Sequence, residues 1–546
     1  MEIPTPTRPP APALWARLWP WLMVAAAIVF VGAIRVRLLP VPLERDEGEY
    51  AYGGQLLLQG IPPYEFLYSM KLPGTSLMYA LGMLLFGETT TGIHLTLILV
   101  NSLTIIFVFL LGRSLAGSLA GALSAICYGF LSLSPSVLGL AAHATQFVVL
   151  FAVPGTWLLL RAGPAGNPRT LFASGLLFGF ACLMKQPGLC FGAFGVVYLG
   201  GQAWCQRQCA SRGFVRRLLV FGAGLALPVL LVCALLAWAG VFPKFWFWTI
   251  SYARSYEQLT TWQDGIQGFL GGHLRATRDM SMGAWLLVLA GGLTGCALKP
   301  LRPALCFTGV WWLFAFGGTS MGLYYRPHYF ILLLPAFALF LGLATVALQK
   351  VMPARFLADV FKSLPVLALG LILSWMLYYH GQVLFQLPAN QVSNFVYRDN
   401  PFMEAVGAAD QIRAHSAPTD RIAVIGSEPE IFFYAHRHSA TGYIYTYPLM
   451  EAHPYALLMQ QAMAREIEAA RPEFLVQVAF LTTGVPLVGS SRYLTDWAAD
   501  YAGKMYTLAG TVRYADGKTI CTWGPTNARP PAGQYLLIYQ RRTAPQ

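Results

Sequence analysis

The chain has 546 residues, of which 56% are hydrophobic and only 11% are charged. Its mean hydropathy is +0.53, and several apolar runs exceed the ~18 residues that a membrane-spanning helix needs. The sequence therefore predicts an α-helical polytopic membrane protein, since the long runs lack the period-2 alternation of a β-barrel. The net charge of +13 does not indicate a nucleic-acid partner, because arginine and lysine fall in short clusters between the apolar runs.

The hydropathy pattern predicts about eleven membrane spans. Trp15, Trp19 and Trp21 mark the entry to the first span, as residues of an interfacial aromatic belt do. Residues 1–13 are rich in proline and lack a signal-peptide cleavage pattern, so the first span is expected to stay as an anchor. The predicted spans are 18–38, 91–112, 116–134, 144–161, 170–184, 187–203, 217–240, 282–298, 304–322, 328–348 and 363–384.

The charges of the loops predict the orientation of these spans. The segment 204–217 carries four arginines and no acid, whereas acids gather in the segment 44–49 on the opposite side. Arg35 and Arg37 are exceptions at the outer end of the first span, but the balance favours a cytoplasmic N-terminus. With an odd number of spans, the C-terminus then lies outside. We expect a multi-pass protein of the plasma (inner) membrane with an extracytoplasmic C-terminal domain.

The outer side also holds two predicted amphipathic helices, 50–58 and 74–86, which are expected to lie in the membrane interface. From about residue 390 the composition changes to that of a soluble protein. We therefore predict a multi-span membrane domain, 1–389, and a small extracytoplasmic α/β domain, 390–546. In the second domain we expect strands at 421–425, 474–478 and 535–539, a helix opened by a capping box at Ser427–Glu430, and a helix at 454–470.

The densest charge in the chain is Glu44-Arg45-Asp46-Glu47-Gly48-Glu49, directly after the first span. Crowding of like charges and partial burial shift carboxylate pKa values, so such a cluster can supply a general base. Its place at a membrane boundary indicates chemistry at the bilayer surface. The alternative is a solvated loop that begins an interfacial helix, because acids favour helix N-termini.

Cations lie on the same predicted side of the membrane. Lys71 shares the outer loop with the acids, Lys185 joins two spans, and Arg326 and His328 open another span beside Tyr329. Ionisable groups at membrane depth are costly unless they face a polar cavity, so they are functional candidates. An acid among cations suits a lipid phosphate beside a hydroxyl nucleophile. The alternative for each cation is a headgroup contact or an interfacial anchor.

Three motifs in this order resemble the polyprenyl-phosphate-dependent glycosyltransferases of the protein-mannosyltransferase and aminoarabinose lipid A transferase type. The resemblance covers about residues 18–350. Its motifs are Arg45-Asp46-Glu47-x-x-Tyr50-Ala51 continued by Gly60-x-Pro62-x-Tyr64 and Lys71-x-Pro73, then Met184-Lys185-Gln186-Pro187-Gly188, and then Pro327-His328-Tyr329 followed by residues 332–335.

The resemblance implies a glycosyltransferase C-like fold and a sugar donor carried on a polyprenyl phosphate. It implies Asp46 as the general base of an inverting transfer to an acceptor hydroxyl, with Glu47 orienting the acceptor. The acceptor would be a lipid, a glycan or a protein, and membrane lipids would be further partners. The implied donor-phosphate ligands are Lys71, Lys185, Arg326 and His328, and the implied acceptor or cavity residues are Tyr50, Tyr64, Gln146 and Tyr329.

The chain departs from the family pattern at three positions. Met70 replaces an acid, Glu49 replaces an arginine, and Gln146 stands where related bacterial proteins often have a carboxylate. His143 and Gln146 also fit helix–helix hydrogen bonding. No residue is assigned as a metal ligand and no cofactor is certain, although a divalent metal remains possible. The rival functions are a lipid-linked sugar flippase or transporter, against which the one-sided charges argue, and a non-catalytic membrane scaffold.

Overall fold

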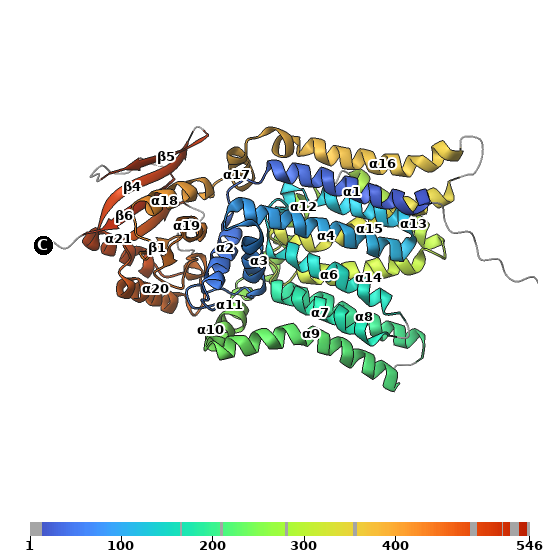
Figure 1. Cartoon of the computed structure of the whole chain (residues 1–546), viewed down its shortest axis with the longest axis horizontal. Helices are drawn as coiled ribbons and strands as arrows, with labels where there is room; N and C mark the ends of the chain where they lie inside the picture. The colour runs from blue at the N-terminus through green and yellow to red at the C-terminus, as the bar shows by residue number, and fades with distance from the viewer. Residues whose placement is uncertain are drawn as a thin grey trace, which may run out of the picture.

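The computed structural model describes residues 14–163, 166–207, 211–278, 282–352, 358–480, 489–515, 517–524 and 534–542. It consists of a bundle of long helices and a C-terminal α/β unit at one end of that bundle (Figure 1). The long helices are α1 (Leu14–Arg37), α4 (Thr90–Ala116), α5 (Ser118–Leu131), α6 (Ala144–Arg161), α7 (Pro168–Met184), α8 (Leu189–Cys205), α9 (Arg212–Trp238), α13 (Met282–Ala297), α14 (Arg302–Thr319), α15 (Leu334–Val351) and α16 (Ala358–Tyr379).

Each predicted span coincides with one of these helices, but the predicted count of eleven is not confirmed. Among the described residues, seven helices are long and apolar enough to cross a membrane, or eight if α12 (Trp262–Thr277) and α13 form one bent span. The helices α3 (Gly74–Phe86), α5 and α7 are apolar but shorter. The chain is a multi-pass membrane protein with fewer full-length spans than its hydropathy predicts, because hydropathy registers apolar helices whatever their length.

Glycines let two helices of the bundle approach closely. A Cβ atom on Gly175 of α7 would meet the backbone carbonyl of Phe221 in α9, and a Cβ on Gly224 of α9 would meet that of Phe172 in α7. Small residues at such crossings allow backbone contact between membrane helices, where dispersion rather than the hydrophobic effect drives association. The bundle is thereby a rigid support for the loops at its end.

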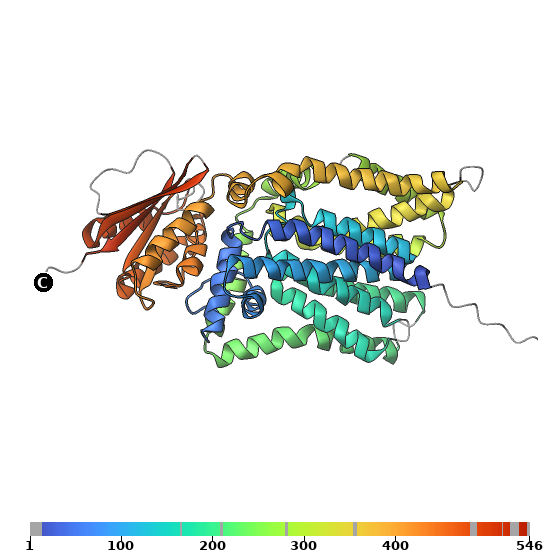
Figure 2. The ribbon, with the colours of Figure 1, turned by 45° about the horizontal axis from the view of Figure 1, so that its top comes forward.

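The helix α2 (Arg45–Leu58) lies across the end of the bundle, between it and the C-terminal unit (Figures 1 and 2). Its residues 47–56 are all buried, so the prediction of an interfacial amphipathic helix is wrong for this segment. A Cβ on Gly48 would come within 2.6 Å of the backbone nitrogen of Glu430, at the start of α19 (Glu430–Ala435). The absence of a side chain at Gly48 lets the two helices touch.

The C-terminal unit contains a six-stranded mixed sheet in the order β2-β1-β3-β6-β4-β5. β1 pairs with β2 and β3 in parallel, while the pairs β3–β6, β6–β4 and β4–β5 are antiparallel. Its elements are α17 (Ala389–Tyr397), α18 (Phe402–Ala414), β1 (Arg421–Ile425), α19, β2 (His438–Ser439), α20 (Ala456–Ala470), β3 (Phe474–Ala479), α21 (Tyr493–Met505), β4 (Tyr506–Ala515), β5 (Lys518–Trp523) and β6 (Tyr535–Arg541).

The three predicted strands and the helix over 454–470 are confirmed by β1, β3, β6 and α20. The predicted capping box at Ser427 is wrong, because α19 has no side-chain cap. The Ser427 hydroxyl instead accepts a hydrogen bond from the backbone N–H of Tyr447 at 2.9 Å. The predicted boundary at 389/390 falls at the start of α17, and the division into two domains stays a prediction.

Candidate functional site

The first turn of α2 fixes the acidic cluster in space. Glu44 is the N-cap, and its carboxylate accepts the backbone N–H of Glu47 at 2.9 Å, while the Glu47 carboxylate accepts the N–H of Glu44 at 3.3 Å. This reciprocal capping satisfies two backbone donors that a helix start leaves open. Asp46 lies between the two caps and is free to face away from them.

One oxygen of Asp46 is held by a cation and a phenol. Lys71 Nζ lies 2.7 Å from Asp46 Oδ1 and 2.6 Å from Glu49 Oε2, and the Tyr445 hydroxyl donates to the same Oδ1 at 3.1 Å. Ser69 donates to the other oxygen of Glu49. Burial by itself would raise the pKa of Asp46, but Lys71 and then the nearby imidazoles hold it well below its usual range. The pairing therefore keeps Asp46 ionised.

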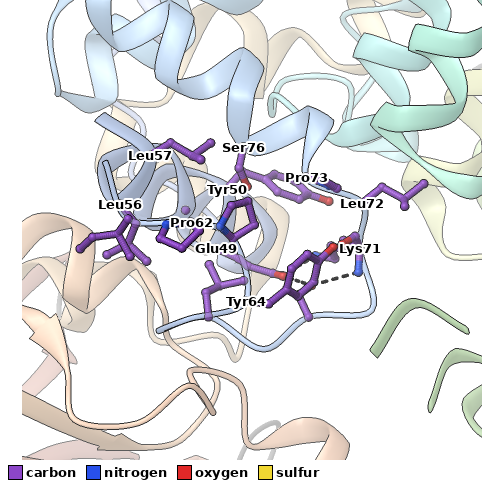
Figure 3. Close-up of a pocket in the computed structure, with 15 residues that line it drawn as sticks. Glu49, Tyr50, Leu56, Leu57, Pro62, Tyr64, Lys71, Leu72, Pro73 and Ser76 are labelled. Atoms are coloured by element: carbon purple, nitrogen blue, oxygen red, sulfur yellow. Dashed lines mark hydrogen bonds and ion pairs between the residues drawn. The ribbon is translucent and has the colours of Figure 1, made fainter. Parts of the chain in front are cut away.

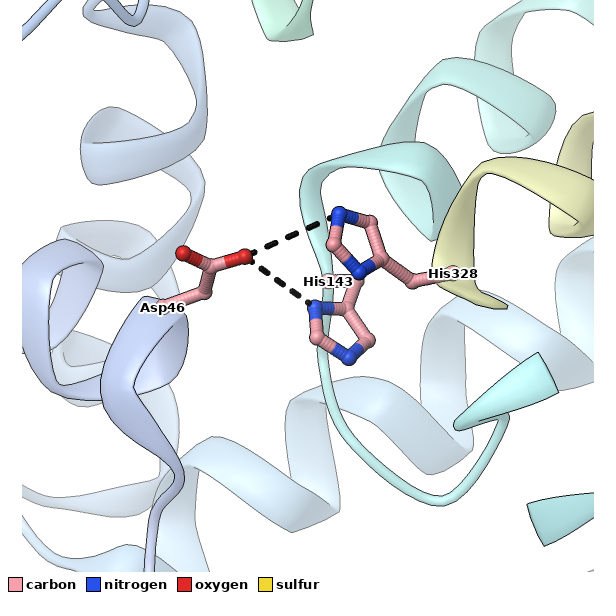
Figure 4. Close-up of side chains that lie close together, drawn as sticks. All are labelled: Asp46, His143 and His328. Carbon is pink, nitrogen blue, oxygen red and sulfur yellow. Dashed lines mark ion pairs between the residues drawn. The ribbon is translucent and has the colours of Figure 1, made fainter. Parts of the chain in front are cut away.

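The other oxygen of Asp46 faces two histidines (Figure 4). Oδ2 lies 3.7 Å from His143 Nδ1 and 3.8 Å from His328 Nε2, and the two imidazole rings stack with centroids 4.3 Å apart. His143 precedes α6 and His328 lies in the short helix η4 (Pro327–Leu333). Burial lowers the pKa of His143, but Glu44 and Asp46 outweigh burial and raise it overall. Segments nearly 300 residues apart thus meet at one carboxylate.

The Glu47 carboxylate, unlike that of Asp46, is used for contacts within the protein. Its Oε1 accepts the backbone N–H of Ala142 at 2.6 Å and lies 3.4 Å from His94 Nε2, and the residue is 1% exposed. These contacts use the carboxylate to anchor α2 to the loop before α6. The predicted role of Glu47 in orienting an acceptor therefore gains no geometric support.

Lys185 lines a cavity, and Arg326 contacts one of the tyrosines that line it. The cavity of about 280 Å³ is lined by Lys185, Tyr329 and Tyr256 among others. The Lys185 ammonium lies 3.8 Å from the centre of the Tyr329 ring, and burial lowers its pKa to about 7. Arg326 donates hydrogen bonds to the Tyr256 hydroxyl at 3.2 Å and to the Tyr447 hydroxyl at 3.3 Å.

Three of the predicted acceptor residues do not line this cavity. Tyr50 packs its ring 4.6 Å from the Lys71 ammonium, and the Tyr64 hydroxyl donates to the carbonyl of Lys71 at 2.8 Å. Both line a separate pocket of about 30 Å³ (Figure 3), which is much smaller than the cavity lined by Lys185. Gln146 is fully buried and donates to the carbonyl of Gly139 at 3.3 Å. These residues position the loops of the site.

The C-terminal unit supplies residues that the sequence did not single out. Tyr445 reaches Asp46 and Tyr447 reaches Arg326, so one loop contacts both the acid and a cation. Arg45 adds a second contact between α2 and the C-terminal unit, donating to the Ser427 carbonyl at 2.6 Å and to Glu428 at 3.1 Å. No local pattern indicated these partners; only the alternation of tyrosines at 443, 445 and 447 hinted that one edge faces a common surface.

The comparisons with known sequences give relatives of one enzyme class. Residues 71–238 match the family model described as dolichyl-phosphate-mannose-protein mannosyltransferase. The undecaprenyl phosphate-alpha-4-amino-4-deoxy-L-arabinose arabinosyl transferase of Pseudomonas paraeruginosa is 27% identical over 411 residues, covering 70% of this chain and 67% of that protein. The transferase of the same name from Pseudomonas aeruginosa is 27% identical and covers 60% of this chain. The chain spans 59% of this second relative's length.

Solved structures extend the likeness to nearly the whole chain. ArnT from Cupriavidus metallidurans, bound to undecaprenyl phosphate, matches with a TM-score of 0.58 at 16% identity, over 96% of this chain and 98% of that one. The archaeal oligosaccharyltransferase AglB from Archaeoglobus fulgidus matches with a TM-score of 0.55 at 13% identity, over 96% and 76% of the two chains. The chain has the fold of these transferases. The family model and the Pseudomonas relatives, together with this fold, confirm the resemblance to polyprenyl-phosphate-dependent glycosyltransferases that the motifs indicated.

Proposed function

We propose that this chain is a membrane glycosyltransferase that moves a hexosyl or pentosyl group from a polyprenyl-phosphate donor to an acceptor hydroxyl. The observation that carries the proposal is the partly buried acid Asp46 at the bundle end, which is paired with Lys71 and feels the charge of Lys185, a cation that lines a cavity. The relatives, whose names specify undecaprenyl-phosphate and dolichyl-phosphate sugars, support the donor class. The acceptor would be a lipid, a glycan or a protein.

The two ends of the donor would be held by different groups. Lys185 lines the cavity and Arg326 contacts Tyr256 of its lining, and both cations can donate to phosphate oxygens, with the planar guanidinium suited to bidentate contact. Lys71 is already bound to Asp46 and Glu49, so it would meet the phosphate only by exchanging one of these partners. We therefore assign the leaving phosphate chiefly to Lys185 and Arg326, with Lys71 as the link to the acid.

The transfer would be a single displacement. The acceptor oxygen attacks the anomeric carbon, the bond from that carbon to the phosphate oxygen breaks, and the acceptor proton passes to Asp46 Oδ2. Polyprenyl phosphate leaves with the bonding electrons, and the configuration inverts. Because Lys71 holds the pKa of Asp46 low, proton transfer comes late, when the attacking oxygen has become acidic by bonding to carbon.

The location of the site supports a proposed orientation. The acid, the cations and the C-terminal unit all lie at one end of the bundle (Figure 2). If the loop charges are read by the positive-inside rule, this end faces outward and the N-terminus is cytoplasmic. We place the reaction at the outer face of the plasma (inner) membrane. Labelling of single introduced cysteines from either side of sealed vesicles would test this orientation.

The decisive experiment measures product in isolated membranes. Membranes containing the chain are given a radiolabelled polyprenyl-phosphate sugar, and the Asp46→Asn variant is compared with the wild type. We expect label in a glycosylated acceptor with the wild type, and a loss of about 100-fold or more without the base. Label that crosses the bilayer without a new glycosidic bond would show a flippase instead. Full activity of Asp46→Asn would remove Asp46 as the base.

A further inference from the structure

A second cavity lies in the C-terminal unit, where the end of α17 and the start of α18 meet the sheet. Its volume is about 320 Å³, which falls within the ~300–1,000 Å³ typical of small-ligand sites. Residues between 393 and 404 line it together with the end of β4 and the start of β6, and it shares no lining residue with the cavity of Lys185. Because α17 lies at the junction of the bundle and the C-terminal unit (Figure 1), this second cavity is near the bundle end that carries the acids.

The side chains that line the second cavity combine both signs of charge with aromatic rings. Arg398 and Arg513 bring positive charge, and Asp399 and Glu404 bring negative charge to the same lining. Because these charges balance, the lining does not favour a strongly charged ligand such as free phosphate. Sugar hydroxyls both donate and accept hydrogen bonds, and the C–H faces of sugars pack on aromatic rings. The aromatic residues of the lining are Phe480, Tyr514 and Tyr535.

The backbone at the edge of this cavity is strained and held in place. Arg398 has φ 49° and ψ −114°, a positive φ that is uncommon for a residue with a side chain. Its backbone N–H donates to the Asn394 carbonyl at 2.9 Å, and the Asn400 amide donates to the Tyr397 carbonyl at 2.6 Å. Strained residues persist only where their surroundings fix them, and they cluster at ligand sites.

The same segment connects the cavity with the acids of α2. The rings of Tyr397 and Phe402 lie 5.2 Å apart, and the Arg45 guanidinium lies 5.8 Å from the centre of the Phe402 ring. Burial raises the pKa of the Tyr397 phenol well above its ordinary value, and the charges of Glu44 and its neighbours raise it further. Residues 398–400, between these two rings, line the cavity. A ligand held there is therefore separated from the acidic cluster by one loop.

From this placement we propose that the second cavity binds a saccharide, and that this saccharide is part of the acceptor whose hydroxyl reaches Asp46. Its place in the acceptor rests on the proposed function, whereas the binding of a saccharide does not. The guanidinium groups of Arg398 and Arg513 would donate to sugar oxygens, and the Asp399 carboxylate would accept from sugar hydroxyls. The acceptor is then a glycan or a molecule that carries one.

The test measures sugar binding to the full chain. The protein is placed in phosphatidylcholine nanodiscs, because the headgroups of a maltoside detergent would compete as sugars. Saturation-transfer NMR then screens the methyl glycosides of glucose, galactose, mannose, N-acetylglucosamine and arabinose, with inorganic phosphate as a separate anionic probe. We expect at least one glycoside to bind and phosphate not to displace it.

Two exposed arginines of the lining give the variants for this test. Arg398→Gln and Arg513→Gln should each weaken glycoside binding by about tenfold or more, since each loses a hydrogen bond from a charged donor. Arg492→Gln, a change in an exposed arginine at the start of α21 that does not line the cavity, is the matched control. Thermal unfolding identifies any variant that fails to fold. A wild type that binds none of the glycosides, phosphate that binds in their place, or folded variants with wild-type affinity would overturn the saccharide site.

Sugar transfer in membranes separates this inference from the proposed function. Arg513→Gln should transfer less label while the KM for the polyprenyl-phosphate donor stays unchanged. Wild-type transfer by an Arg513→Gln variant that no longer binds the glycoside would refute the place of the saccharide in the acceptor. A wild type that transfers sugar but binds no glycoside refutes this inference alone. A wild type that binds a glycoside but makes no glycosidic bond refutes the proposed function and leaves the saccharide site standing.

Discussion

The loop of Tyr445 and Tyr447 makes the C-terminal unit part of the candidate site, and removing one hydroxyl tests this. In Tyr445→Phe the ring stays but the hydrogen bond to Asp46 Oδ1 is lost. Burial and then Asp46 raise the pKa of the Tyr445 phenol well above its ordinary value, so in the wild type it is protonated and donates. The substitution therefore removes one donor to the proposed base and changes little else.

The expected magnitude follows from the partner's charge. A hydrogen bond to an ionised group contributes ~1.5–3 kcal/mol, which corresponds to about 10- to 150-fold in rate if it is needed only to place Asp46. Lys71 still holds the same oxygen at 2.7 Å, so we expect the lower part of this range, about 10- to 30-fold in kcat. Tyr447→Phe is the matched comparison. It removes one of two phenols that contact Arg326, so its effect should fall on the KM for the donor.

The assay is transfer from a labelled polyprenyl-phosphate sugar at varied donor concentration. Tyr493→Phe, a change in an exposed tyrosine of α21 that makes none of the site contacts described, controls for general effects on the unit. A lower kcat for Tyr445→Phe with an unchanged donor KM supports a role in placing Asp46. Wild-type kinetics in both Tyr445→Phe and Tyr447→Phe would refute the contribution of this loop.

Three further changes test the electrostatics and packing of the site. Because the Lys185 pKa is about 7, its ammonium is charged below pH 7 and neutral above it. The KM for the donor should therefore rise by about tenfold per pH unit above 7. Lys185→Arg should remove this slope. Glu47→Gln leaves His94 and the Ala142 N–H with a neutral partner and should destabilise the chain by ~3 kcal/mol, measured by thermal or denaturant unfolding in detergent. Gly48→Leu forces a side chain against Glu430 and should lower both stability and transfer. Gly503→Leu in α21, where a Cβ atom meets nothing within 4 Å, is the control.

The sequence predicted the helical bundle because its information is local. Long apolar runs, the prolines and the loop charges are enough to place each helix, and every predicted span coincides with one. They do not report how long an apolar helix is in the folded chain, and so α5 and α7 were counted as full spans. The strands β1, β3 and β6 were also visible, since each is a short run of β-branched and aromatic residues.

The motifs also predicted part of the site. Asp46, Lys71 and His328 meet as the motifs implied, because the motifs record which loops the bundle end brings together. The capping role of Glu44 is local and the sequence pattern could have shown it, whereas the anchoring role of Glu47 and the contact from Tyr445 are tertiary. No window of sequence contains both members of the Asp46–Tyr445 pair, which lie 399 residues apart.

The surroundings of the two lysines, Lys71 and Lys185, show how the cost of burying charge is divided within the site. Lys71 has two carboxylate partners, and although burial by itself lowers its pKa, those partners raise it well above the ordinary value. Lys185 contacts the ring of Tyr329 and, within the described part of the chain, no carboxylate at ion-pair distance, and burial lowers its pKa to about 7. An anion that enters the cavity would be stabilised most by the cation whose charge is balanced by the fewest carboxylates. The same bundle end thus holds one ammonium to fix the acid and another, poorly paired, that a phosphate would stabilise in its charged form.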